Sequence, residues 1–258
     1  MHLQYCCCFI HVRKGRLMCG RFAFYDRLQI IEKYIGRAIY TFAAFKPKYN
    51  IAPTHWIPVI REDEDGDRTI DHMQWGLIPH WSKERPKRPL INARSETAAT
   101  KPSFRTAFKK QRCLIPASGF YEWQTVAGTA QNKPPKQPWF IRAAEPERPL
   151  FLAGLWERWH DPEPSLTNPD NEPILTCTIL TTEANALMHP IHDRMPVILT
   201  TDTDLATWLD VRSKPIEEIQ RLAHPCDDGF LTTWPVSRLV NNPRTDSPDL
   251  IQRVDADR

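Results

Sequence analysis

The chain has 258 residues, 41% of them hydrophobic and 25% charged, and a net charge of +3; these values are typical of a soluble globular protein that buries its own core. No apolar run approaches the length of a membrane span, and the first basic residues follow the apolar opening segment, the reverse of a secretory signal peptide. Seven cysteines lack C-x-x-C spacing, so we expect no metal site, no disulfide framework and a cytoplasmic protein.

The spacing of apolar residues predicts a sheet-rich α+β fold in one domain, with short helices between the strands. Strand patterns occupy residues 19–25, 55–62, 68–78, 113–124, 138–144, 151–159, 174–182 and 229–237. Helix patterns occupy residues 26–36, 103–112, 203–210 and 215–224. Polar and proline-rich composition predicts a loop at 46–54, a poorly ordered loop at 160–173 and a flexible tail after residue 241.

Positive charge is concentrated in residues 83–112, which we call the basic segment. It carries ten Lys and Arg side chains against two acids, Glu84 and Glu96. This local excess of +8 leaves −5 for the rest of the chain, because the total is +3. Such a segment on an otherwise slightly acidic protein is typical of a phosphate-binding surface. A solvated basic loop and helix face is the alternative.

Six polar residues stand in otherwise apolar or structured stretches and are candidates for a site: Cys19, Arg21, Asn92, Arg94, Glu122 and His192. Glu122 lies between Tyr121 and Trp123, and burial beside aromatic rings raises the pKa of a carboxyl group, which suits it to proton transfer. Each residue taken singly has a structural alternative, since buried polar groups commonly satisfy the backbone. No nucleotide-binding glycine motif and no HExxH motif is present, so we expect no cofactor.

Six short segments, "MCGRF", "YNIAPT", "WGLIP", "INARSET", "GFYEW" and "IHDRMP", occur in this order. Together they resemble the SRAP family of SOS response-associated peptidases and abasic-site processing proteins, from Met18 to about Trp234. The resemblance implies a single domain of twisted, largely antiparallel sheets with short flanking helices around a basic cleft. It also implies binding of single-stranded DNA at abasic sites in the DNA damage response, with autopeptidase and abasic-site lyase activities. We expect the protein to be a monomer.

By this resemblance the family's catalytic residues map to Cys19, Asn92, Glu122 and His192. Its DNA contacts map to Arg21, Arg94, Trp81, Asn50 and Pro53. Asn92 would orient the amine of Cys19, Glu122 would transfer protons, and His192 would protonate the leaving sugar oxygen or assist release of the crosslink. Members of the family often carry two adjacent tryptophans where this chain has His80-Trp81.

The chemistry can also be built from Cys19 itself. An abasic site opens its sugar to an aldehyde, which condenses only with a neutral amine. An α-amine with a pKa of about 7.8 is roughly 15% neutral at pH 7, whereas a lysine with a pKa of about 10.4 is almost entirely protonated. An N-terminal cysteine also carries a thiol that attacks the imine carbon and closes a five-membered thiazolidine ring. An internal cysteine cannot do this, because its nitrogen is an amide.

Met18 stands directly before Cys19 and offers a route to this terminus, because methionine aminopeptidase removes an initiator Met that precedes a small residue. Residues 1–17 would then be an upstream stretch included by assignment of the start codon. Self-cleavage of that stretch by a literal peptidase is the alternative. We therefore expect an extension at 1–17, a folded domain at 18–240 and a tail at 241–258.

Two hypotheses from other classes fit part of the sequence. In a thiol-only cysteine peptidase, Cys19 would be the nucleophile, His192 its base and Asn92 the orienting residue. In a non-enzymatic single-stranded DNA-binding protein, the basic segment and the tryptophans would suffice. Neither hypothesis explains why Met should directly precede Cys19.

Overall fold

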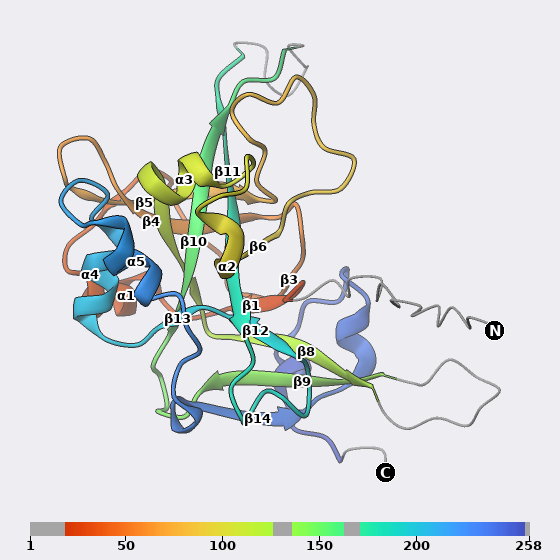
Figure 1. The fold of residues 1–258 in the computed structure, drawn as a ribbon. Helices are drawn as coiled ribbons and strands as arrows, with labels where there is room; N and C mark the ends of the chain where they lie inside the picture. The colour runs from red at the N-terminus through yellow and green to blue at the C-terminus, as the bar shows by residue number, and fades with distance from the viewer. Residues whose placement is uncertain (1–18, 126–135, 163–170, 256–258) are drawn as a thin grey trace, which may run out of the picture.

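The computed structural model describes residues 19–125, 136–162 and 171–255 (Figure 1). These residues form two β-sheets with short helices at their sides, so the predicted α+β class is confirmed, and most strand pairs are antiparallel. None of the helices in these ranges is long and apolar enough to cross a membrane. The predicted extension at 1–17 and the middle of the predicted loop at 160–173 lie outside the described residues.

The smaller sheet has five strands in the order β14-β9-β8-β1-β3. Their bounds are β14 Leu231–Pro235, β9 Lys136–Ala143, β8 Gly119–Thr125, β1 Phe22–Phe24 and β3 Lys48–Ile51. Strand β1 is the inner strand between β3 and β8, with Phe22 opposite Ile51 on one side and Phe120 on the other. This register directs the residues just before β1 toward the middle of β8.

The larger sheet closes on itself. Its strands are β2 Ile39–Tyr40, β4 Trp56–Glu62, β5 Arg68–Trp75, β6 Asn92–Arg94, β7 Arg112–Ala117, β10 Leu150–Trp159, β11 Ile174–Glu183, β12 Arg194–Pro196 and β13 Ile198–Leu199. Strands β11, β10, β7, β4 and β5 are neighbours in that order, and β5 pairs in parallel with β11 to complete a ring. The short strand β6 adds to β11 in parallel.

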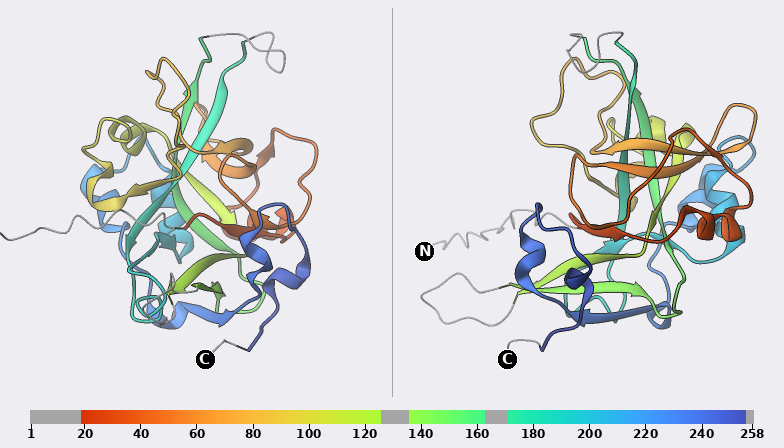
Figure 2. Two further views of the ribbon diagram at one scale, coloured as in Figure 1. Left: turned by 90° about the vertical axis from the view of Figure 1, so that its right-hand side faces the viewer. Right: turned by 180° about the vertical axis from the view of Figure 1, so that it is seen from behind.

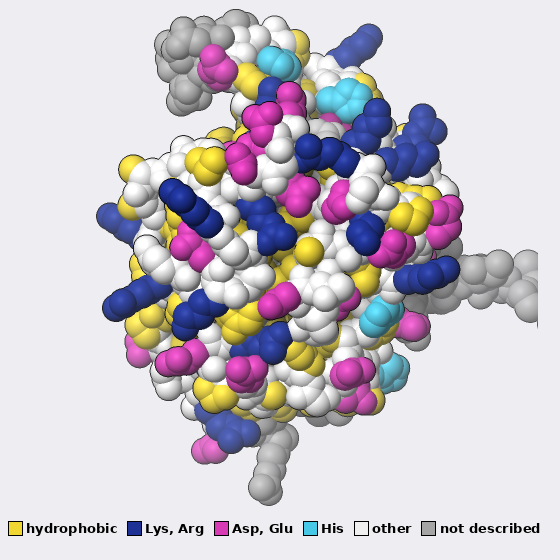
Figure 3. All heavy atoms as spheres, turned by 90° about the vertical axis from the view of Figure 1, so that its left-hand side faces the viewer, with side chains coloured by type: hydrophobic (Ala, Val, Ile, Leu, Met, Phe, Trp, Pro, Cys, Tyr) yellow, Lys and Arg dark blue, Asp and Glu magenta, His cyan; other side chains and the backbone are white. Residues whose placement is uncertain are grey.

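The helices are short, as the many prolines lead one to expect. They are α1 Leu28–Ile35, α2 Ser95–Ala98, α3 Arg105–Lys110, α4 Asp202–Leu209 and α5 Ile216–Arg221. Helix α1 ends at Gly36, whose φ of 75° is readily adopted only by glycine. Helices α1, α4 and α5 lie together on one side of the molecule (Figure 1). On that face acidic and basic side chains are interspersed (Figure 3).

The main core fills the space between the two sheets and under the helices. Phe22 of β1 and Trp75 of β5 are fully buried and meet edge to face, with their ring centroids 5.2 Å apart. Trp208 of α4 is also fully buried and donates from Nε1 to the carbonyl oxygen of Cys113 at 2.9 Å. Aromatic rings therefore connect the smaller sheet, the ring of strands and the helical side.

The segment after residue 241 differs from the flexible tail that its composition predicted. Short 3₁₀ helices form at Arg238–Asn241 and Pro248–Ile251, and Leu250 is fully buried in a small cluster with Tyr121. Figure 2 shows this segment beside the smaller sheet. The carbonyl oxygen of Ile251 accepts a hydrogen bond from Trp234 Nε1 at 2.9 Å. Contacts with strands distant in sequence thus order a polar segment. The predicted loop at 46–54 also differs, because β3 forms within it.

Candidate active site

Cys19 stands just before β1, the strand that pairs with β8. Its backbone N–H donates a hydrogen bond to Oε1 of Glu122 at 2.6 Å. Both residues are buried, with 1% of Cys19 and 2% of Glu122 exposed. The pairing of Phe22 with Phe120 explains the contact, because two further residues along each antiparallel strand lead to Gly20 and Glu122. Cys19 has a φ of 36°, a strained conformation for a residue other than glycine that is often found at functional sites.

Burial makes the carboxyl group of Glu122 a weak acid. Desolvation raises its pKa to about 8, although the N–H groups of Cys19 and Trp123 and the charge of Lys136 act in the opposite direction. The carboxyl group is therefore largely protonated at neutral pH, which confirms the prediction of a raised pKa. The pKa of the Cys19 thiol is also raised well above its usual value, by burial and then by the charge on Glu122.

Asn92 lies close to the same place. Strand β6 pairs with Ile179, Leu180 and Thr181 of β11, and the preceding residue, Ile91, packs against the beginning of β1. A Cβ atom added to Gly20 would lie 3.9 Å from Cδ1 of Ile91. The carbonyl oxygen of Ile91 accepts from Trp75 Nε1 at 3.0 Å and from the N–H of Ile179 at 3.1 Å. This fixed backbone holds partly buried Asn92 next to the turn into β1.

His192 is on the connection between β11 and β12 and is 8% exposed. Its Nδ1 accepts from the N–H of Arg194 at 3.2 Å and lies 2.9 Å from Oδ1 of Asp193. Two observations place this connection beside β8. Gln124 Nε2 donates to the carbonyl oxygen of Pro190 at 3.1 Å, and the charge of Asp193 raises the pKa of Glu122. The structure therefore brings the four predicted catalytic residues to one place, from β1, β6, β8 and the β11–β12 connection.

The predicted DNA contacts divide into residues at or near the surface and residues whose side chains are hydrogen-bonded within the protein. Trp81 is 56% exposed, Arg94 is exposed at the beginning of α2, and Pro53 is partly buried in the turn after β3. Arg21 is partly buried, and its Nη1 donates to Oδ1 of Asn50 and to the carbonyl oxygen of Val240, each at 2.7 Å.

Asn50 differs from its predicted role as a DNA contact. It is 1% exposed, and its Nδ2 faces the carbonyl oxygens of Val240, Asn242 and Thr245 at 3.3, 3.0 and 2.7 Å. Its side-chain amide is thus occupied inside the protein, where it holds the C-terminal segment against β3.

The basic segment also loses one member. Arg112 is 2% exposed, and its guanidinium donates to the carbonyl oxygens of Trp208, Phe108, Lys109 and Asp210. Burial lowers its pKa to about 10. The other Lys and Arg side chains of the segment are exposed: Lys83, Arg85, Lys87, Arg88, Arg94, Lys101, Arg105, Lys109 and Lys110. They remain available to phosphate groups.

Sequence reasoning missed two groups near the site. Asp193, whose charge raises the pKa of Glu122, could have been found only from its place beside His192 in "IHDRMP". The second group anchors the loop that carries Trp81. Nδ1 of His80 lies 3.1 Å from Oε2 of Glu157, and Trp159 Nε1 donates to the carbonyl oxygen of Ser82 at 2.8 Å. His80 thus ties this loop to β10.

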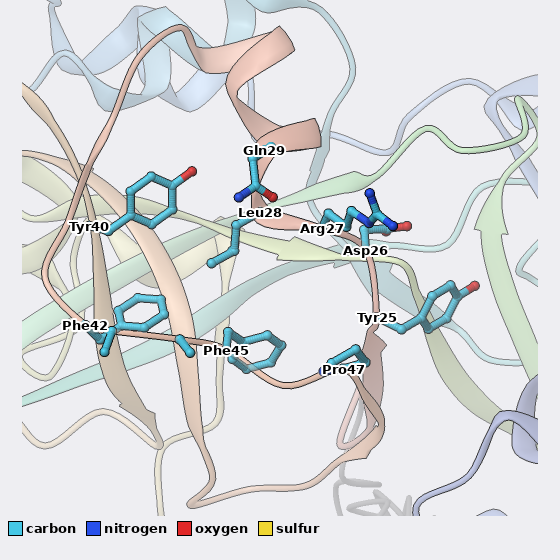
Figure 4. A pocket seen from close by; sticks show the side chains of 11 residues that line it. Tyr25, Asp26, Arg27, Leu28, Gln29, Tyr40, Phe42, Phe45 and Pro47 are labelled. Carbon is cyan, nitrogen blue, oxygen red and sulfur yellow. The ribbon is translucent and has the colours of Figure 1, made fainter.

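One pocket lies away from Cys19. It has a volume of about 530 Å³ and lies at the opposite end of β1, where Tyr25 and Asp26 follow the strand. Leu28, Tyr40, Phe42 and Phe45 gather around it (Figure 4). Among the residues that the structure describes, no group of three His, Cys, Asp or Glu side chains is placed to hold a metal ion. The described cysteines, Cys19, Cys113, Cys177 and Cys226, are buried free thiols.

Known proteins resemble this chain in sequence and in fold. The sequence profile described as "SOS response associated peptidase (SRAP)" matches residues 18–243. The abasic site processing protein YoqW of Bacillus subtilis is 39% identical over 238 residues, which cover 91% of this chain and 99% of YoqW. The abasic site processing protein HMCES of Gallus gallus is 32% identical over 240 residues, 82% of this chain and 67% of that protein.

A crystal structure of a Bacteroides thetaiotaomicron protein superposes with a TM-score of 0.76 at 25% identity and covers 92% of this chain and all of its own. The profile match alone covers far more than half of the chain, and it includes Cys19, Asn92, Glu122 and His192. The chain therefore belongs to the SOS response associated peptidase (SRAP) family.

Proposed function

We propose that the protein processes abasic sites in single-stranded DNA through a covalent bond to Cys19, once the residues before Cys19 have been removed. The observation that carries the proposal is the 2.6 Å contact between the backbone nitrogen of Cys19 and Glu122. The acid–base group of the site thus faces the nitrogen of Cys19. In a chain that begins at Cys19, this nitrogen is the α-amine.

The proposed reaction uses both groups of that residue. The neutral amine attacks the aldehyde carbon of the opened sugar, the C=O π bond breaks, and one proton moves from nitrogen to the former carbonyl oxygen. Glu122, protonated below its pKa of about 8, donates a proton to this hydroxyl group, which leaves as water, and its carboxylate then takes the second proton from nitrogen to give a neutral imine. The thiol then adds across the C=N bond: sulfur bonds to carbon, and its proton goes to nitrogen. The products are a thiazolidine and one water molecule.

The remaining residues have supporting roles in this proposal. Asn92 orients the amine, and His192 protonates the sugar oxygen that is released when the ring opens. Arg94 and the exposed cations of the basic segment hold phosphate groups on either side of the lesion. Trp81, which is 56% exposed, stacks on a neighbouring base. Peptidase and lyase activities at the same site belong to this proposal as secondary reactions.

The state of the thiol disfavours a thiol-only cysteine peptidase. Such an enzyme needs a thiolate, and reactive cysteines have a pKa below the usual value. Here burial and the charge of Glu122 raise the pKa of the Cys19 thiol, so the resting group is a protonated thiol. Addition to an imine tolerates this state, because the thiol proton is transferred to nitrogen in the same step.

A comparison of three chains tests the proposal. The chains are the full sequence, one that begins at Met18, and one with a single Gly between Met18 and Cys19. Each is incubated with single-stranded DNA that contains an abasic site, and heat-resistant crosslinks and intact masses are measured. We expect a stable adduct from the Met18 chain after loss of its Met, and none from the Gly-blocked chain, although the Gly-blocked chain keeps its thiol.

The controls separate the alternatives. Cys19→Ser should form an imine that a hydride reductant traps, but no stable ring. Equal crosslinking by the Gly-blocked and Met18 chains would show that the amine is not used and would favour a thiol-only reaction. Binding without a covalent product from any of the chains would indicate a non-enzymatic DNA-binding protein.

A further inference from the structure

Three aromatic side chains meet on the outer face of the strand ring. Phe42 stacks on His72 of β5 with a centroid distance of 5.0 Å and an interplanar angle of 27°. Trp56 of β4 also contacts His72, with the centroids 5.9 Å apart and an interplanar angle of 46°. Trp56 is 48% exposed. With Lys46 and Arg85, these rings form what we call the Trp56 patch.

The strand register explains why these rings meet. Trp56 is the cross-strand partner of Gln74, and Pro58 is the partner of His72. His72 and Gln74 are two residues apart on β5 and therefore point to the same face. Their neighbours Asp71, Met73 and Trp75 point inward and are buried. An exposed indole on this face is not required by the core.

Lys46, Trp56 and His72 of the patch line an open cavity of about 420 Å³. Ile51, which is 1% exposed, lies at its base. Phe45, Lys46 and Trp56 are on its sides. Phe42 and Phe45 come from one segment, which separates this cavity from the pocket in Figure 4. The dimensions and the apolar base suit a flat ring system.

Cations flank the rings at both ends. Lys46 is exposed at one end, beside Lys48, which pairs with Asp246 at 2.9 Å. At the other end half-exposed Arg85 donates from Nη1 to Oε1 of Gln74 at 3.3 Å, and its Nε lies 3.4 Å from Oδ2 of Asp161. Gln74 Nε2 donates to the carbonyl oxygen of Thr54 at 3.2 Å.

The rings themselves carry no net charge at neutral pH. Burial lowers the pKa of His72, so its imidazole is neutral, and Phe42 and Trp56 cannot ionise. Neutral rings between cations match a base between two phosphate groups.

One strand and one turn connect the patch to the strand that follows Cys19. Ile51 pairs with Phe22 of β1, and only the turn through Pro53 separates Ile51 from Trp56. That turn is held by the hydrogen bond from the N–H of Thr54 to the carbonyl oxygen of Trp75 at 2.7 Å. Trp56 is thus one turn away from the strand that pairs with β1.

We propose that the Trp56 patch is a second nucleic-acid subsite, which stacks an unpaired base of the DNA strand whose abasic site lies at Cys19. This inference rests on the proposed function. Lys46 and Arg85 contact the phosphate groups that flank the stacked base. The subsite is independent of base identity, because every base offers a flat π-face.

Affinity for single strands of two lengths tests the subsite. Each strand carries a reduced abasic analogue that cannot open to an aldehyde, so no covalent step contributes. Trp56→Ala should weaken binding of the long strand by about fivefold to a hundredfold, the usual effect of removing one base–aromatic stack. The loss should shrink for a strand too short to pass Pro53. Trp56→Phe should restore most of the affinity.

A matched control is Ile39→Ala. Ile39 is 53% exposed on β2, so it resembles Trp56 in exposure but lies outside the patch, and its variant should bind like the parent protein. A strand with 5-iodouracil at successive positions on either side of the analogue should give a photoadduct at Trp56 from a narrow range of positions.

The outcomes can be told apart. Unchanged long-strand affinity in Trp56→Ala overturns the proposal. If that variant instead alters self-association, the patch is a contact between proteins, and the proposal is likewise overturned. If the parent protein forms no crosslink with a reactive abasic strand but Trp56→Ala still weakens binding, the proposed function fails and the subsite stands.

Discussion

Glu122 and Glu157 look alike but have different surroundings. Each lies on a strand, is 2% exposed and has a pKa raised mainly by burial. Glu122 accepts from the backbone nitrogen of Cys19. Glu157 faces the imidazole of half-exposed His80, which can carry a compensating charge. A buried carboxyl group is therefore not by itself a catalytic group; the atom that it contacts decides its chemistry.

The largest expected effect separates the two carboxyl groups in the reaction. Glu122→Gln should slow crosslinking of a chain that begins at Cys19 by on the order of a hundredfold at neutral pH, because one acid–base group is lost. Glu157→Gln should leave the crosslinking rate within a few fold of the parent rate, since Glu157 contacts His80 and not Cys19. Single-turnover crosslinking at saturating DNA measures both rates. Equal crosslinking rates for the two variants would show that Glu122 has no role in the reaction that Glu157 lacks.

The second prediction uses pH. Burial raises the pKa of Glu122 to about 8 in the folded protein from its ordinary value of 4.5, so the folded state favours the protonated group. Its contribution to stability is complete below about pH 4.5 and is lost as the pH rises through about 8. Glu122→Gln should therefore gain stability over the parent protein between pH 5 and 9, by on the order of a few kcal/mol.

Urea unfolding at several pH values measures this difference. Glu157→Gln should shift the free energy of unfolding in the same direction but by less. The reason is that the hydrogen bond and charge of His80 partly offset the rise in the pKa of Glu157 that burial causes. A difference between Glu122→Gln and the parent protein that does not change with pH would mean that Glu122 is not buried as the structure shows.

The third prediction concerns the partner of Glu157. His80→Ala leaves a buried carboxyl group without its imidazole and should destabilise the protein by about 1 kcal/mol, at the low end for an unsatisfied buried acceptor because His80 is half exposed. Combination with Glu157→Gln should recover most of this loss in a double-mutant cycle. Urea unfolding at one pH is sufficient. Additive effects of the two substitutions would show that His80 and Glu157 do not interact.

The fourth prediction has the smallest expected effect and separates DNA binding from the crosslinking reaction. Arg94→Ala should weaken binding of intact single-stranded DNA and reduce the slope of log affinity against log salt by roughly one phosphate contact. Glu122→Gln should leave this slope unchanged. Arg221→Ala is a matched control, because Arg221 is exposed at the end of α5, on the face of mixed charge (Figure 3). A slope that responds to Arg221 but not to Arg94 would exclude the basic segment from binding.

Local patterns were sufficient for much of the fold. Alternating apolar residues predicted the strands at 55–62, 151–159 and 174–182, which the structure contains as β4, β10 and β11. The aromatic neighbours of Glu122 predicted its raised pKa. These properties depend on residues close in sequence, and for that reason a single sequence carries them.

Burial of individual polar residues was not predictable in this way. Arg112 looked like part of the basic segment, yet its guanidinium donates to carbonyl oxygens on α3, on α4 and directly after α4. Asn50 looked like a DNA contact, yet it binds carbonyl oxygens about 190 residues away. A cation or an amide can be solvated or can bind the backbone inside the protein, and only the packed chain decides between these states.

By itself, the sequence of this protein determined the α+β class, the order of most elements, the family and the pair of candidate residues Cys19 and Glu122. The tertiary structure decided that these two residues meet through nitrogen and carboxyl oxygen, that the segment after residue 241 packs beside β3, and that Trp56, His72 and Phe42 form one surface. The physical reason is sequence distance: Cys19 and Glu122 are 103 positions apart, and only the register of β1 on β8 closes that gap.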